Sequence, residues 1–143
     1  MESDLPWFYL AVRRKLAADA GFMAACGGRL SEGLPASVTQ PLATVQFPGS
    51  IGAMGGGGYK PLVQIDAWCP PGVFSGLEAS AVVWRIVSRA KRVLEYTHNE
   101  PFETMHWSAR PVDLMPLPLD VSRGESNPLF RAMTRAVLTV KNT

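Results

Sequence analysis

The sequence predicts an α/β (α+β) fold, in which a mixed or antiparallel β-sheet with one long hairpin is flanked by two main α-helices. Three observations predict it: apolar residues at helical spacing near 5–18 and 77–96, two strand-like runs on either side of a glycine-rich segment, and two-residue alternation near the C-terminus. The chain of 143 residues has the usual length of one domain, which we expect to span residues 1–143.

The first helix is predicted to end near Ala18. Ser3 or Asp4 can cap it, and Pro6 lies near its first turn, where a missing N–H costs little. Asp19 can cap a further short turn before Gly27. The apolar face of the first helix consists of Leu5, Phe8, Tyr9, Val12 and Leu16.

Two runs predict an antiparallel hairpin. Pro41–Pro48 is rich in β-forming residues, and Tyr59–Trp68 is its expected partner, while Arg29–Leu34 could form a short strand before them. Gly49–Gly58 lies between the two runs and predicts a loop that is far longer than a tight turn. We expect this loop to become ordered only on contact with a partner.

The second long helix is predicted to follow a capping box, Ser75–Glu78, and to run to about Tyr96. Short or edge strands are expected in the proline-punctuated segment, at 105–114, and a closing strand at 130–141. The apolar face of the helix is expected to contain Leu77, Ala81, Trp84, Val87, Ala90 and Leu94.

Composition narrows the class of protein. Apolar residues make up 47% and charged residues 18%, and the formal net charge is only +2, so overall charge gives no argument for nucleic-acid binding. Cys26 and Cys69 fit buried thiols, and the acidic start Met-Glu-Ser-Asp differs from a signal peptide. We expect a soluble protein with no membrane contact and no cofactor.

Catalytic and ligand motifs fail on spacing. A P-loop needs Lys and Ser or Thr where Gly58 and Tyr59 stand, and a strand rather than a helix follows the glycines. His98 and His106, which lie near Glu100 and Glu103, match no metal-ligand spacing, and Ser122–Ser126 is no nucleophile elbow. Asp66, within an apolar strand, should be exposed or paired with an arginine. We therefore predict no enzyme.

Basic residues form two sets. Arg85, Arg89 and Arg92 share one side of the second long helix, and Arg131 and Arg135 share one side of the last strand. Either set could meet DNA phosphates, an acidic neighbouring subunit, or only solvent.

The order of elements resembles the tail terminator (tail completion) proteins of long-tailed bacteriophages. The resemblance is carried by the layout of Ala18–Leu30, Pro41–Val45, and Val63–Trp68 leading into Glu78–Leu94. It implies a virion protein of the tail and neck, assembled in the host cytoplasm as a homo-oligomeric ring of six subunits. Such a ring caps the tail tube, contacts the tail-tube protein and the head–tail connector protein, and could touch DNA passing through its channel.

The resemblance gives the glycine-rich hairpin an expected use in docking to a neighbouring subunit or to the tube. The residues expected to make these contacts are Gly55, Gly56, Gly57, Gly58 and Tyr59, with Arg85, Arg89, Arg92, Arg131 and Arg135. Two alternatives remain: a head-closure or connector protein of the phage neck, and a small ligand-binding α/β domain.

Overall fold

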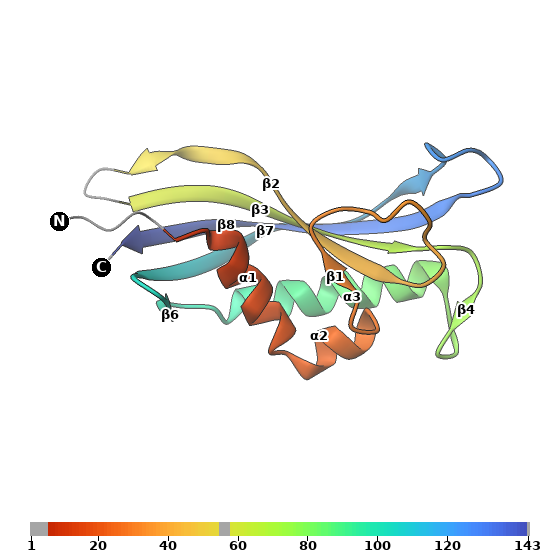
Figure 1. Ribbon diagram of the computed structural model, residues 1–143, viewed down its shortest axis with the longest axis horizontal. Helices are drawn as coiled ribbons and strands as arrows, with labels where there is room; N and C mark the ends of the chain where they lie inside the picture. The colour runs from red at the N-terminus through yellow and green to blue at the C-terminus, as the bar shows by residue number, and fades with distance from the viewer. Residues whose placement is uncertain (1–5, 55–57, 143) are drawn as a thin grey trace.

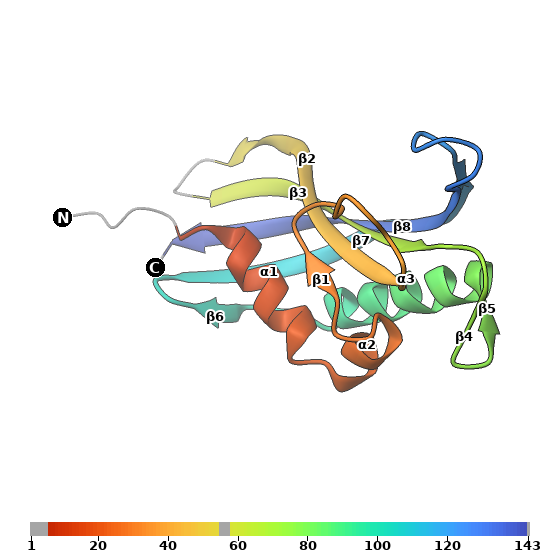
Figure 2. The same cartoon turned by 45° about the vertical axis from the view of Figure 1, so that its right-hand side comes forward.

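The computed structural model describes residues 6–54 and 58–142, and it confirms the α+β class. Six strands form one mixed sheet in the order β1-β2-β3-β8-β7-β6, and a separate two-stranded pair is formed by β4 and β5. The sheet curls, and all three helices lie on one of its sides (Figures 1 and 2). We call the other side the helix-free face.

The elements have the following bounds. The helices are α1 Phe8–Ala17, α2 Ala20–Ala25 and α3 Ala79–Glu95. The strands are β1 Leu30–Ser31, β2 Leu42–Met54, β3 Gly58–Cys69, β4 Val73–Phe74, β5 Leu77–Glu78, β6 Glu100–Phe102, β7 Met105–Asp120 and β8 Leu129–Asn142.

The core lies between the helices and the central strands. Helix α3 packs on β8, β3 and β7, and it turns a continuous apolar stripe toward them because buried residues recur at helical spacing. Strands β3 and β8 face it with every second residue, as the pleat requires. The buried residues of α3 are Ala79, Val82, Val83, Ile86, Val87, Ala90 and Leu94.

Helix α2 begins and ends at the residues predicted from the sequence. The Asp19 carboxylate accepts a hydrogen bond of 2.8 Å from the Phe22 N–H, so the predicted cap of α2 is confirmed. Gly27 and Gly28 both have positive φ, which ends α2 without a Cβ penalty. At α1 the N-cap is Trp7, with no side-chain capping bond. The predicted caps Ser3 and Asp4 lie outside the described residues.

The predicted glycine loop is largely strand. Strand β2 continues to Met54, which pairs with Gly58, so only residues 55–57 separate β2 from β3. Two register shifts, between Gln46 and Gly49 and between Ser50 and Ala53, each place one extra residue on β2. Such bulges accommodate Pro48, which cannot donate to a regular ladder. The expectation of a ten-residue loop is therefore wrong.

The predicted capping box is also wrong. Ser75 and Gly76 have φ of 52° and 79° and join β4 to β5 in a tight hairpin. Two consecutive positive φ values suit a two-residue hairpin turn better than the entry to a helix. The N-cap of α3 is instead Glu78, which makes no side-chain capping bond. Trp84, expected on the apolar face, is 42% exposed.

The proline-rich segment forms a longer strand than predicted. Strand β7 pairs with β8 from Met105 to Asp120, with shifts after Pro111 and after Leu117. Its other neighbour, β6, reaches only to Trp107, so most of the outer edge of β7 has no strand partner among the described residues. Because the Ala109 N–H donates to the Thr97 carbonyl, away from β8, Pro111 two residues later also turns its nitrogen to this edge.

Matched valine substitutions test the position of the core. Val87 of α3 is fully buried and Val73 of β4 is 68% exposed, so the same change to alanine removes the same atoms from two environments. We expect Val87→Ala to lower the free energy of unfolding by about 2 kcal/mol. Val73→Ala should change it by less than about 0.5 kcal/mol. Urea denaturation measures both, and equal effects would contradict the assigned core.

Candidate interaction surfaces

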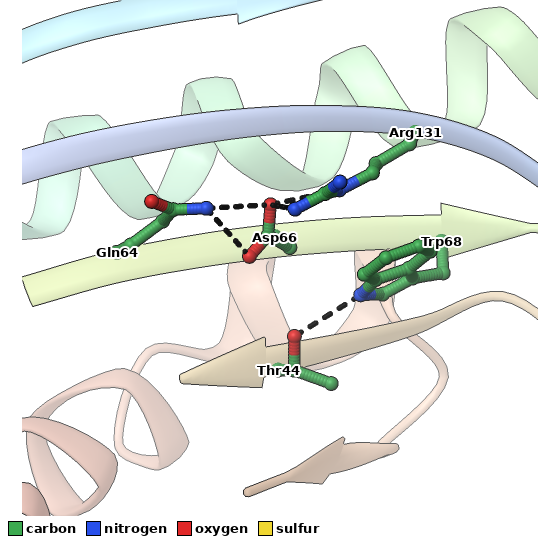
Figure 3. A network of polar contacts seen from close by, with 5 residues as sticks. All are labelled: Thr44, Gln64, Asp66, Trp68 and Arg131. Atoms are coloured by element: carbon green, nitrogen blue, oxygen red, sulfur yellow. Dashed lines mark hydrogen bonds and ion pairs between the residues drawn. The ribbon is translucent and has the colours of Figure 1, made fainter. Parts of the chain in front are cut away.

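A buried polar network occupies the helix-free face (Figure 3). Asp66 of β3 accepts hydrogen bonds from Arg131 Nε at 3.1 Å and Nη2 at 3.0 Å, and from the Gln64 amide at 3.0 and 3.2 Å. The Arg131 guanidinium also lies 4.4 Å from the centre of the Trp68 ring, whose indole N–H donates to Thr44 Oγ1 at 3.0 Å. Three strands, β2, β3 and β8, are thereby tied through side chains.

The charge of Asp66 lies in a buried position, where it is separated from solvent. The side chain is fully buried, and burial raises the pKa of the Asp66 carboxyl, while the nearby Arg131 charge and the Gln64 hydrogen bond partly offset this. Cross-strand placement explains the pair, since Asp66 is opposite Met133 and Arg131 is opposite Trp68 in the register. The expectation that Asp66 pairs with an arginine is confirmed.

A second ion pair on the same face joins Arg135 of β8 to Asp113 of β7, which are direct cross-strand partners. Arg131 and Arg135 do share one side of the strand, as predicted. Both guanidinium groups are nevertheless engaged within the chain, so neither is a free cation for a partner.

A loop covers one end of the helix-free face. Leu34 and Val38, from the segment between β1 and β2, pack on a small apolar cluster of Leu42, Trp68 and Leu129. Arg123, in the connection between β7 and β8, fixes this segment with hydrogen bonds of 2.7 and 2.8 Å to the carbonyls of residues 35 and 36. The cover closes an otherwise apolar part of the sheet without a helix.

The arginines of α3 have different environments. Arg89 donates to both carboxylate oxygens of Asp19, at 2.8 and 3.1 Å, so it ties α3 to the start of α2. These hydrogen bonds lower the pKa of Asp19, with Arg89 the largest cause. Arg85 and Arg92 are exposed, and no ion pair is formed by either within residues 6–54 and 58–142. The predicted set of three is therefore one structural arginine and two exposed ones.

An aromatic cluster lies where α1 meets the hairpin. The Phe8 ring is 4.7 Å from that of Phe47 in an edge-on arrangement and 5.8 Å from that of Tyr59. Trp7, which is 50% exposed, lies 5.7 Å from Phe47. Tyr59 thus belongs to a contact between elements. Gly58 pairs with Lys141 in the sheet, whereas Gly55, Gly56 and Gly57 lie outside the described residues.

Other exposed apolar side chains are distributed along and just after β7. Val112 and Leu119 lie at the two register shifts of β7 and are 42% and 46% exposed. Val121, the first residue after β7, is 50% exposed. Sequence analysis missed this surface because the prolines suggested short pieces of strand. The signal was present as a run with few charges, from Pro111 to Leu119.

The described residues bring no set of metal ligands together, and both of their cysteine thiols are buried. Among the described residues, no group of three or more His, Cys, Asp or Glu side chains is placed to hold a metal ion. The described helices are too short or too polar to cross a membrane. Burial raises the pKa of both thiols, that of Cys69 to about 11, which disfavours the reactive thiolate form.

Comparison with known proteins gives a structural likeness. No family model and no curated protein matches the sequence. A chain from a solved structure described as the virion of a native gene transfer agent (GTA) particle is similar in fold, with a TM-score of 0.51 and 16% identity. The likeness covers 90% of this chain and 91% of that chain. The two chains therefore share an arrangement over nearly their whole lengths.

The buried ion pair predicts a large effect of one arginine. In Arg131→Ala, Asp66 would stay buried without its cation, and we expect unfolding to become easier by about 3–5 kcal/mol at pH 7. Arg135→Ala, the matched control at a half-exposed pair, should cost about 1 kcal/mol or less. The destabilisation by Arg131→Ala should become smaller as the pH falls. Without the Arg131 charge, the pKa of Asp66 in the folded variant is raised further, so the folded variant takes up a proton at a higher pH than the unfolded chain and loses the buried charge. A cost that did not change with pH would contradict this account.

The Asp19 pair predicts the opposite dependence on pH. Asp19→Asn keeps the helix cap and removes the ion pair with Arg89. Because the folded-state pKa of Asp19 is below its usual 3.8, the advantage of the native residue should be present at pH 5–7 and disappear as the pH falls through that lower value. Urea denaturation at several pH values measures it. An advantage that persisted at pH 2 would show that the charge is not its source.

Proposed function

We propose that this chain is a structural virion protein that caps the completed phage tail tube as a ring and forms the joining surface to the head connector. One observation carries the proposal: the fold matches a chain from a virion particle over nine-tenths of both chains. The order of elements, which resembles the tail terminator proteins, supports the same role. We propose no catalytic activity.

The distribution of apolar surface supports assembly. A closed ring built from identical subunits needs two different patches on each subunit, because neighbours meet head to tail. Within the described part of the chain, the sheet offers two largely free edges on opposite sides, since β1 pairs with Ala43 and Thr44 of β2, and β6 covers the start of β7. The β7 edge carries the exposed side chains Val112 and Leu119. In this proposal, that edge contacts the β2 side of the next subunit, which includes Trp7.

The proline positions indicate how the β7 edge would make contact. Pro111 is opposite Ala136 and Pro116 is opposite Ala132, four residues apart on β8, so both prolines turn the same way. Neither has an N–H, so a neighbouring strand could not form a complete ladder along this edge. The subunit contact would instead depend on side-chain packing of the apolar residues.

Native mass spectrometry over a range of concentrations, with negative-stain images, tests the ring. We expect a closed species, of six subunits, in Val73→Asp as well as in the native protein, because Val73 is 68% exposed on β4, which pairs with β5 in a separate sheet. Val112→Asp/Leu119→Asp should abolish the ring and leave a folded monomer. A ring that survives this double change would overturn the assigned contact.

Binding to isolated virion parts tests the place of the ring. A tail terminator should bind purified tail tubes and raise the yield of tails that join to heads. Binding to DNA-filled heads without binding to tubes would instead favour the head-closure alternative. A strict monomer that binds neither would contradict the assembly role.

A further inference from the structure

The helix-free face has a second region whose charges are not matched within the described chain. The register places Thr139 of β8 between Lys60 of β3 and Ser108 of β7, since Tyr59 pairs with Val140 and Leu62 with Val137. Two residues further along in each direction, Lys141 and Arg110 point to the same side, because alternate residues share a face. Three cations from three strands thus meet on one side of the sheet.

A count of carboxylates shows that these cations are unmatched. Along β2, β3, β7 and β8, within the described residues, the acidic side chains are Asp66, Asp113 and Asp120. Asp66 and Asp113 are held by arginines, and Asp120 accepts from the Ser122 N–H at the far end of the strand. Of the arginines predicted from sequence, Arg89, Arg131 and Arg135 are held by carboxylates, whereas Lys60, Arg110 and Lys141 form no ion pair within residues 6–54 and 58–142.

The surface around these cations is hollowed. A depression of about 510 Å³ extends from this face around the outer edge of β7 to α3, and its lining includes Lys60 and Arg110 on the face together with Lys91 and His98 from α3 and the residues after it. Glu95 is the single carboxylate of the lining, and Lys91 contacts it at 3.5 Å. The hydroxyls of Ser108 and Thr139 also line the hollow. These are the donor types that proteins use for phosphate oxygens.

We propose that this cationic face, centred on Lys60, Arg110 and Lys141, binds the phosphate backbone of duplex DNA without sequence preference. Neighbouring strands are about 4.8 Å apart and residues along a strand about 3.4 Å apart, so the three cations span roughly 10–15 Å. That spread suits several phosphates of a polymer better than one small anion. The lining contains no Phe, Tyr or Trp ring, the larger platforms on which single-stranded bases stack, so the duplex backbone is the better match.

The inference goes beyond the proposed assembly role and can be tested without it. Binding is measured on the protein in solution, in whatever oligomeric state it has, with a fluorescently labelled duplex of random sequence. Three phosphate contacts predict a weak, salt-dependent interaction, with log K falling against log salt concentration with a slope of about −3. Fluorescence anisotropy between 50 and 200 mM NaCl measures that slope.

Two charge-matched variants decide the site. Lys60→Gln/Arg110→Gln/Lys141→Gln should weaken binding by about tenfold or more at 50 mM salt and bring the slope close to zero. Arg13→Gln/Arg85→Gln/Arg92→Gln removes the same charge from exposed positions in the helical layer and should bind as the native protein does. Each single change on the cationic face should reduce the slope by about 0.9, so the test survives if the triple variant does not fold.

Three results would overturn the proposal. The first is an equal loss in the helical-layer variant, which would show that only net charge matters. The second is competition by polyglutamate as effective as that by unlabelled duplex of equal charge, which would favour an acidic protein surface as the partner. The third is the absence of binding by the native protein at 50 mM salt. Failure of ring formation would affect none of these measurements, so the two proposals can fail separately.

Discussion

The contact between α3 and the central strands β3 and β8 is the constraint on which the rest of the structure depends. A sheet of six strands has two faces to shield from water, but the helices of this chain cover only one. Burial on that side uses small and branched side chains such as Val63, Ile65 and Ala136, which let the helix lie close. The loop, the buried ion pair and the cationic region described above all lie on the other face, the helix-free face.

The helix-free face is shielded piece by piece. Near one end, a loop fixed by Arg123 covers Trp68. In the middle, Asp66 and Arg131 satisfy one another, so a charged pair occupies space that a second layer would normally fill. Toward the hairpin, the face is polar and cationic. A single sheet thus presents three chemically different regions along its length.

Features that depend on residues within one helix or strand could be predicted from the sequence. Features that depend on the pairing of two elements could not. The presence of α3 with Val87, Ala90 and Leu94 on its buried side, the two-residue alternation of β8 and the Asp19 cap were predicted, because each depends on residues close together in the chain, whereas Leu77, Ala81 and Trp84 of the predicted stripe are not buried. The hairpin was misjudged because Pro48 and its glycines were taken to end the strand. Pairing with β3 over many residues outweighs that local preference, and bulges absorb the two extra residues.

The candidate surfaces show the same division. Arg131 and Arg135 were correctly predicted to share one side of β8, but their partners Asp66 and Asp113 lie 65 and 22 positions away in the chain (131 − 66 and 135 − 113), and no local spacing reveals such pairs. Arg89 likewise finds Asp19 only through the packing of α2 on α3. Lys60, Arg110 and Lys141 become a group only through the register. Whether an arginine is free is a property of the whole fold.

The missing N–H groups of Pro111 and Pro116 have a consequence for how the β7 edge can meet other chains. An exposed apolar edge strand normally recruits other strands and leads to aggregation. Here the edge is apolar, but Pro111 and Pro116 cannot donate hydrogen bonds to an added strand, so a continuous ladder cannot extend from it. An apolar edge of this kind favours side-chain contact with a partner of matching shape over the addition of further strands.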